Sequence, residues 1–380
     1  MSTRPFINFD HNATTAPRAE VIEVVARMMR DAWGNPGSRH SAGRKARREL
    51  ESARERIAAI LGARPDEVIF TSGGTESTHL ALHGLLRGSS GTIVAPPGEH
   101  PATEETLAQL ARHGCYRHTL AIDTDGLVTP DALAAVPWES TRLVSLLLAH
   151  NETGVLQDIA PIAAACRDHG VPLHVDAVQA VGKIPVDFAA LQVTALSLGA
   201  HKFHGPRGIG ALLVRQGVKL TPSLRGGHQE QGRRPGTECV ALAVGMAKAL
   251  ELWHADRDAH TAYLTELRDR LWAGLQRQCS PVLLIGHPTR RLPNTLNIAF
   301  PGCDGEALLV ALDLAEVGCS LGSTCASGAA EIAPILQAMQ VPTELARGCL
   351  RFTLGIDNTP QEIDEAIARI SDIPARSASK

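Results

Sequence analysis

The sequence predicts an α/β protein with a large, mostly parallel sheet and a smaller α+β region towards the C-terminus. Two observations support this fold class. From about residue 15 to residue 215, short apolar runs alternate with helix-like stretches, which is typical of a parallel sheet with helices on both faces. Beyond a long helical region, strand-like and helix-like segments no longer alternate in that way. A chain of 380 residues has room for two or three domains, or for one large α/β unit with an appendage.

The first strong helix signal lies at residues 41–63, with Ser41 available as its N-cap. Its apolar positions fall on one helical face: Ala46, Leu50, Ala53, Ile57 and Ile60/Leu61. Six short apolar runs follow and are predicted to be strands: 67–72, 91–96, 141–150, 171–177, 193–200 and 208–214. The stretches between the first five of these runs include three helical segments: 74–86, 102–114 and 159–170.

The pattern changes after residues 235–278, which form a long helical region leading into the smaller domain. In that domain, residues 295–300 and 349–354 are predicted to be strands. Residues 305–314 and 360–370 are predicted to be helices.

Composition excludes several classes of function. Hydrophobic residues make up 44% of the chain, enough for a substantial core, and the net charge of −3 provides no basic field for nucleic acid or an anionic membrane. Aromatic residues make up only 3%, which argues against stacking platforms for bases. The first residues contain no apolar signal segment, and no apolar run approaches 18 residues, so we expect a soluble cytoplasmic protein.

The eight cysteines show neither the spacing of a zinc site nor that of a secreted disulfide framework, so we expect no metal site. Most are expected to be small buried side chains. Cys325 is the exception, because it lies in the stretch GSTCASG, where small residues surround it and no hydrophobic pattern would bury it. An exposed thiol is a liability unless its chemistry is used.

Three features at predicted strand ends suggest a cofactor site. TSGGTES joins a strand to a helix through two glycines, which can form an anion site, although alone it favours an ordinary turn. Asp176 directly follows a strand and alone would be read as a helix cap, and Lys202 follows a later strand. Together they match the needs of pyridoxal phosphate: a phosphate turn, a carboxylate for the pyridinium nitrogen and a lysine for the aldehyde. His100, after another strand, is available to cover the ring.

With these features in place, the sequence closely resembles the pyridoxal-phosphate cysteine desulfurases of the NifS/IscS type, in the class V aminotransferase group. The resemblance covers nearly the whole chain. The matching stretches are FDHNATT, GNPGSRH, TSGGTES, EH, NETGVLQDI, HVDAVQAVGK, AHKFHGPRGIG, GGHQEQGRRPGTE, NTLNIAF, GSTCASG and LRFTLG. The resemblance implies fold type I and a homodimer with shared active sites. It also implies a large cofactor-binding domain at 15–255 and a small domain made of 1–14 and 256–380.

The resemblance also implies roles for individual residues. Lys202 would bind the cofactor covalently, Asp176 would pair with the pyridinium nitrogen and His100 would stack on the ring. Other residues would surround the cofactor: Asn151 and Gln179 near the ring oxygen, and Gly74, Thr75 and His201 at the phosphate, with Thr237 of the other subunit. Arg351 would bind the substrate carboxylate, assisted by Asn35 and Asn151, because a guanidinium matches a planar anion. Cys325 would be the nucleophile, on a segment that must be small and mobile, whereas Cys319 is expected to serve packing.

The sequence departs from the family pattern at four positions. Gly199 stands where a serine often contacts the phosphate, so that contact is missing. Gly37 and Pro235 replace serines, and Ile356 replaces an arginine. These departures concern cofactor affinity and the rim of the site, and leave the reacting groups intact.

The activity implied is conversion of L-cysteine to L-alanine, leaving the sulfur as a persulfide on Cys325. The sulfur acceptor would be an iron–sulfur scaffold or a thiolation enzyme. A selenocysteine lyase or another pyridoxal-phosphate lyase or aminotransferase on the same fold is the alternative, and such an enzyme would not need Cys325. A carrier module without turnover is disfavoured, because Lys202, Asp176, His100 and Arg351 are all present.

Overall fold

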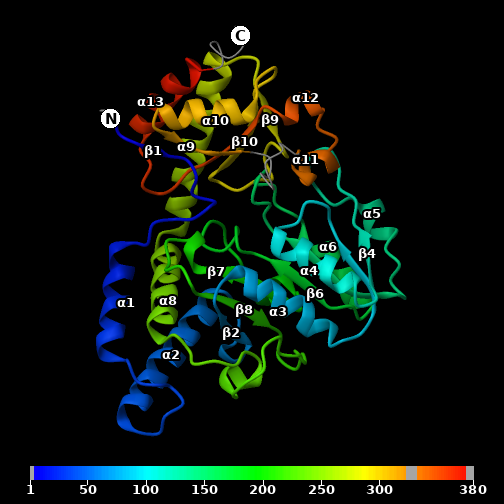
Figure 1. Ribbon diagram of the computed structural model, residues 1–380, viewed down its shortest axis with the longest axis vertical. Helices are drawn as coiled ribbons and strands as arrows, with labels where there is room; N and C mark the ends of the chain where they lie inside the picture. The colour runs from blue at the N-terminus through cyan, green and yellow to red at the C-terminus, as the bar shows by residue number, and fades with distance from the viewer. Residues whose placement is uncertain (1–3, 322–331, 374–380) are drawn as a thin grey trace.

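The computed structural model describes residues 4–321 and 332–373 and has two parts, each built around its own sheet. In Figure 1, the larger part with its sheet lies below, and the smaller part, which contains both ends of the chain, lies above. Helix α8 (Val240–Ala255) lies in the larger part, and α9 (Arg257–Gln278) follows it into the smaller part. The sequence predicted a long helical region at 235–278, and the structure has two helices there, because the backbone of Asp256 leaves the helical conformation between them.

The larger sheet has seven strands in the order β2-β8-β7-β6-β5-β3-β4. Four of its six pairings are parallel, and β8 runs antiparallel to both of its neighbours. The strands are β2 (Val68–Thr71), β3 (Gly91–Ala95), β4 (Cys115–Thr119), β5 (Thr141–Leu147), β6 (Leu173–Asp176), β7 (Ala195–Gly199) and β8 (Gly210–Val214). All six strands predicted in this region are present. β4 was not predicted, because only the first of its five residues is buried at the edge of the sheet.

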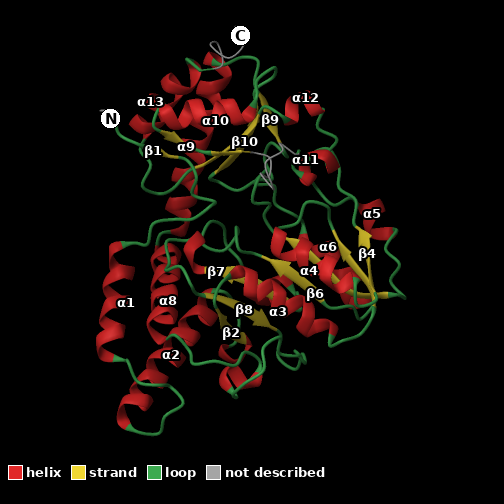
Figure 2. Cartoon of the chain, viewed as in Figure 1, coloured by secondary structure: helices red, strands yellow, loops and turns green. Residues whose placement is uncertain are grey.

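Helices cover both faces of this sheet, as the sequence predicted (Figure 2). One face packs against helices that include α2 (Ser41–Ile60), α6 (Ile159–Asp168) and α8. The other packs against α3 (Gly74–Leu86) and α4 (Pro101–Ala111). The remaining helices of this part are α1 (Ala19–Asp31), α5 (Pro130–Ala134) and α7 (Phe188–Leu191), none of which was predicted.

The cap of α2 corrects a detail of the sequence prediction. His40, not Ser41, is the N-cap, and its Nδ1 accepts a hydrogen bond from the Gly43 amide at 3.3 Å. Ser41 is the first residue of the helix.

The smaller part contains a four-stranded antiparallel sheet in the order β12-β13-β10-β9 and a parallel pair, β1-β11. Its strands are β1 (Ile7–Asn8), β9 (Leu283–Ile285), β10 (Thr295–Ala299), β11 (Val317–Gly318), β12 (Ser320–Leu321) and β13 (Cys349–Thr353). Its helices after α9 are α10 (Gly305–Leu314), α11 (Pro334–Ala338), α12 (Thr343–Ala346) and α13 (Pro360–Ser371). Because β1 pairs with β11, the N-terminus belongs to this part, and Phe9 meets Phe352 edge to face at 6.4 Å. We propose that the domain boundary lies at Asp256.

The cysteines are less buried than the sequence suggested. Of the seven in the described ranges, Cys115, Cys166 and Cys349 are buried. Three others are half-buried and Cys239 is exposed. Within residues 4–321 and 332–373, no helix combines the length and apolar character needed to cross a membrane.

Candidate active site

A cavity of about 230 Å³ lies where β5 and β6 end, beside the N-terminus of α3. Parallel strands bring their carboxyl ends to one edge of a sheet, which is where ligands bind in α/β proteins. Ten of the described residues line the cavity: Gly74, Thr75, His100, Leu147, Asn151, Asp176, Val178, Gln179, His201 and Lys202. Eight of them were predicted from the sequence, and only the apolar Leu147 and Val178 were not.

The N-terminus of α3 forms an open cradle of backbone amides. The first amides of a helix have no partner within the helix and attract anions. A Cβ on Gly74 would come within 2.5 Å of Val178 Cγ2, so only glycine allows α3 to begin so close to that side chain. Glu76 in the first turn is engaged elsewhere, because its carboxylate accepts two hydrogen bonds from Arg234, at 2.7 and 3.1 Å. This cradle fits a phosphate group.

Asp176 is a buried carboxylate with few partners. Its Oδ1 accepts a hydrogen bond from the Val178 amide at 2.9 Å, and its Oδ2 is 3.5 Å from the Thr78 hydroxyl. Burial raises the pKa of Asp176, and the nearby His100 and Lys202 partly oppose that increase. In the described part of the chain no cation forms an ion pair with Asp176, and such a buried carboxylate is suited to a protonated ring nitrogen. The donor set therefore fits pyridoxal phosphate.

His100 is both the cap of α4 and a wall of the cavity. Its Nδ1 accepts a hydrogen bond from the Ala102 amide at 3.0 Å. Burial lowers the pKa of His100, and Lys202 contributes to that decrease while Asp176 opposes it. The neutral ring with an accepting Nδ1 carries its proton on Nε2.

Lys202 lies in the single 3₁₀ turn that follows β7. Its Nζ donates hydrogen bonds to the carbonyl oxygens of Asn12 at 2.6 Å and Ala13 at 2.9 Å, both in the N-terminal segment. Burial, followed by the neighbouring Arg351, lowers the pKa of Lys202 to about 8. The amine is therefore much easier to deprotonate than an ordinary lysine, as a nucleophile or base requires.

The buried Lys183 belongs to the polar network beside the cavity and was not assigned a role from the sequence. Its Nζ donates to Asn12 Oδ1 at 2.6 Å and to Gln179 Oε1 at 2.5 Å. Gln179 Nε2 in turn donates to the Asn12 carbonyl at 3.0 Å. Burial lowers the pKa of Lys183 well below its ordinary value, and the cations Lys202 and Arg351 lower it further. The amide of Gln179 is thus held at both ends.

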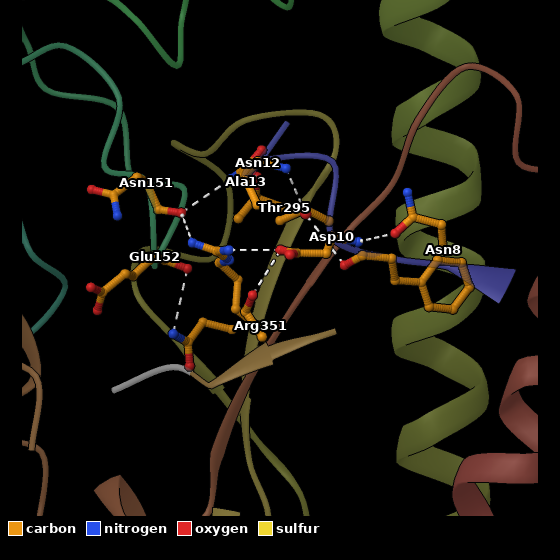
Figure 3. A network of polar contacts seen from close by, with 12 residues as sticks. Asn8, Asp10, Asn12, Ala13, Asn151, Glu152, Thr295 and Arg351 are labelled. Atoms are coloured by element: carbon orange, nitrogen blue, oxygen red, sulfur yellow. Dashed lines mark hydrogen bonds and ion pairs between the residues drawn. The ribbon is translucent and has the colours of Figure 1, made fainter. Parts of the chain in front are cut away.

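Arg351 lies on β13 of the smaller sheet and reaches the rim of the cavity through Asn151 (Figure 3). Its Nη1 donates to the Asn151 carbonyl at 3.2 Å, and its Nη2 donates to Asp10 Oδ1 at 2.8 Å. Asn12 Nδ2 donates to the same Asn151 carbonyl at 3.1 Å. The guanidinium is buried, and its Nε has no hydrogen-bond partner among the described residues.

His150 links the loops that carry His100 and Asn151, a contact that the sequence analysis missed. Its Nε2 lies 2.9 Å from the Gly98 carbonyl, and its Nδ1 accepts from the Glu152 amide at 3.2 Å. Burial lowers the pKa of His150 to about 4, so the ring is neutral and its Nε2 donates. A histidine directly before the predicted Asn151 was the only local signal for this role.

Three predicted site residues in the described ranges do not line this cavity: Arg351 reaches only its rim, and two others lie elsewhere. Asn35 and Thr237 line a separate open hollow, together with the exposed Trp33 and Met29. Cys325 lies outside the described residues. Cys319 is half-buried against the smaller core, and burial raises its pKa to about 12, which agrees with a packing role. Among residues 4–321 and 332–373, no group of three or more His, Cys, Asp or Glu side chains could hold a metal ion.

Comparisons with known proteins agree with this geometry. The model of the family Aminotransferase class-V matches residues 7–366. The cysteine desulfurase IscS of Dictyoglomus turgidum is 41% identical over 361 residues, which cover 94% of this chain and 92% of the relative. The cysteine desulfurase NifS of Azotobacter vinelandii is 38% identical, over 97% of this chain and 93% of the relative. A solved NifS-like protein superimposes with a TM-score of 0.92 at 34% identity, over 98% of this chain and 100% of that one. The chain therefore belongs to the aminotransferase class-V family and, within it, to the cysteine desulfurases of the IscS and NifS type.

Proposed function

We propose that this cysteine desulfurase binds pyridoxal 5'-phosphate in the cavity around Lys202, converts L-cysteine to L-alanine and retains the sulfur as a persulfide on Cys325. One observation carries the proposal: Lys202, Asp176 and the amides at the start of α3 line a single cavity. These are the groups that the aldehyde, ring nitrogen and phosphate of the cofactor require.

Each group has a role that follows from its chemistry. When bound, the cofactor supplies an electron sink that stabilises negative charge at the substrate Cα. Gly74, Thr75 and His201 would hold the phosphate, and Asp176 would keep the ring nitrogen protonated. Lys202 would hold the aldehyde covalently until the substrate amine replaces it.

The remaining residues act on the substrate and the ring. Once free, Lys202 moves the proton at the substrate Cα, a task that suits its pKa of about 8. His100 would cover the ring, and Asn151 and Gln179 would lie near its oxygen. Arg351 binds the substrate carboxylate through its fork of donors.

Cys325 completes the reaction. Its thiolate attacks the substrate sulfur and forms an S–S bond while the substrate C–S bond breaks, and the electron pair of that bond stays on the carbon fragment. A proton then completes L-alanine. The persulfide passes to an acceptor protein, either an iron–sulfur scaffold or a thiolation enzyme. We place these steps in the cytoplasm, where thiols remain reduced.

A homodimer explains why two predicted site residues lie outside the cavity. Thr237 and Asn35 line a hollow beside Trp33 and Met29, whose side chains are 73% and 59% exposed. Large apolar side chains gathered at one surface are typical of an interface. A second copy of this chain would cover them and bring its Thr237 to the phosphate of the first.

The decisive experiment replaces Cys325 with serine. Because a serine hydroxyl is not ionised at neutral pH and cannot carry the transferred sulfur, we expect steady L-alanine formation to fall at least about a hundredfold. The spectral change on addition of L-cysteine should persist, because Lys202 and Arg351 are unchanged. Cys319→Ser is the matched control and should keep most of the activity, because burial already prevents ionisation of that thiol.

Mass spectrometry after an anaerobic pulse of L-cysteine tests the location of the sulfur. One extra sulfur should lie on the peptide that contains Cys325 and should disappear with reductant. Normal L-alanine release by Cys325→Ser would favour a lyase of the selenocysteine type instead. Extra sulfur on the Cys319 peptide would contradict the assignment of the nucleophile.

A further inference from the structure

The guanidinium that is assigned to the substrate carboxylate already faces a carboxylate of the protein. Arg351 Nη2 donates to Asp10 Oδ1 at 2.8 Å, and the dashed line between the two residues is visible in Figure 3. Nη1 is directed to the Asn151 carbonyl. The buried Nε is left as a donor without a hydrogen-bond partner among the described residues, although an N–H in such a place is costly to leave unsatisfied. A ligand carboxylate that uses Nε would therefore bind to the same guanidinium as Asp10.

Asp10 is fixed in place from several sides. It forms an isolated bridge with Thr353, and its amide donates to Asn8 Oδ1 at 3.0 Å. The same oxygen that faces Arg351 also accepts a hydrogen bond from the Ser320 hydroxyl at 2.8 Å. Ser320 is paired with Arg351 in the register between β12 and β13. The backbone of Asp10 is thus fixed beside Arg351, and two donors, Arg351 and Ser320, hold its Oδ1.

We propose that Asp10 is a counter-ion built into the substrate site, which weakens the binding of substrate and product carboxylates at Arg351. The inference rests on the proposed function, in which Arg351 binds that carboxylate. Two anions then share one buried cation. The Asp10 side chain is 29% exposed, so solvent screens part of their repulsion, but the shared guanidinium is only 10% exposed, which limits that screening.

The consequence applies equally to substrate and product. L-Cysteine and L-alanine carry the same carboxylate, so Asp10 raises the Kd of both by a similar factor. Such uniform binding changes KM and does not accelerate the chemical step. Its benefit is that L-alanine does not remain in the site and inhibit the enzyme.

Asp10→Asn is the test, because the amide oxygen can still accept from Arg351 and Ser320 while the charge is removed. Equilibrium dialysis of the holoenzyme with radiolabelled L-alanine should show a Kd about three- to tenfold lower. The KM for L-cysteine should fall by the same factor. Asp313→Asn is the matched control: Asp313 is exposed and, within the described residues, forms no hydrogen bond or ion pair with Arg351, so the Kd should not change.

Two further variants keep the test decisive. Ser320→Ala removes a donor that partly neutralises Asp10, so the Kd for L-alanine should rise about twofold, the opposite direction. A Kd that stays the same or rises in Asp10→Asn, or that falls in Ser320→Ala, would overturn the inference. Arg351→Gln separates this failure from failure of the proposed function: if that variant binds L-alanine as tightly as the parent, Arg351 is not the carboxylate site at all.

Discussion

Gly199 offers a direct test of the phosphate cradle, because a serine there would add one hydroxyl at a known place. The backbone at Gly199 is extended, with φ −136° and ψ 125°, so any residue can adopt it. A Cβ would lie 3.3 Å from the amide nitrogen of Gly74 and 3.7 Å from His201 Cδ2. A hydroxyl on that Cβ would therefore be carried next to the first amide of α3, where the phosphate is proposed to bind.

The magnitude follows from two opposing effects. A hydrogen bond to a charged group is worth about 1.5–3 kcal/mol, which corresponds to a roughly 10- to 150-fold lower Kd for the cofactor. Crowding opposes the gain, because a contact of 3.3 Å requires Gly74 to move by a few tenths of an ångström. Gly199→Ala adds the same Cβ without the hydroxyl and so measures the crowding alone.

The assay is titration of the apoprotein with pyridoxal phosphate, followed by absorbance. We expect Gly199→Ser to bind at least about tenfold more tightly than Gly199→Ala, and Gly199→Ala to bind no better than the parent. Equal affinities for the serine and alanine variants would show that the hydroxyl makes no contact with the phosphate. The anion would then have to lie elsewhere than at the start of α3.

Two more predictions concern assembly and stability. Trp33→Glu should weaken the dimer at least about tenfold and reduce L-alanine formation, because it places a charge in the proposed interface and so removes Thr237 of the second copy. Sedimentation measures the assembly. Leu314→Glu, also at an exposed apolar side chain, is the control and should stay dimeric. A dimer unaffected by Trp33→Glu would exclude this surface. Burial lowers the pKa of His174 to about 3, so the unfolded chain binds a proton below pH 6.5 that the folded chain does not. Between neutral pH and pH 5, His174 should therefore lower the free energy of unfolding by about 2 kcal/mol. Denaturant titrations at several pH values measure the slope of that free energy against pH, and His174→Gln should reduce the slope below pH 6.5 by the equivalent of about one proton. An unchanged slope would refute the assignment.

The strands of the larger sheet could be predicted where they are buried, because burial requires a run of apolar residues that is visible in the sequence. The strands from β2 to β8 that were predicted are short apolar runs, and β5 and β7, for example, are almost wholly buried. β4 was missed because the residues CYRHT at the sheet edge are mostly exposed and show no apolar pattern. The two-residue strands β1, β11 and β12 depend on partners distant in the sequence, so no local pattern could indicate them.

The candidate site likewise contains residues that the sequence could predict and residues that it could not. Lys202, Asp176 and the start of α3 could be predicted, because each directly follows a strand in the sequence and parallel strands place such residues together. Lys183 could not, because its partners Asn12 and Gln179 are assembled by the fold, and Asn12 is 171 residues away. Lys183 ends the matching stretch HVDAVQAVGK, but nothing in that stretch alone indicates that its side chain is buried.

Charge explains why the N-terminal segment matters to chemistry that occurs on the larger sheet. Arg351 lowers the pKa of Lys202, whereas Asp176 and Asp10 raise it, so Asp10 offsets part of the effect of the arginine that it contacts. The same segment supplies the carbonyl oxygens that hold the Lys202 amine. A residue that joins the smaller sheet can therefore adjust both the binding of an anion at Arg351 and the proton affinity of the lysine at the cavity. Neither effect requires a contact between Asp10 and the reacting atoms. For that reason the motif FDHNATT contributed to the resemblance but did not indicate a role for its aspartate.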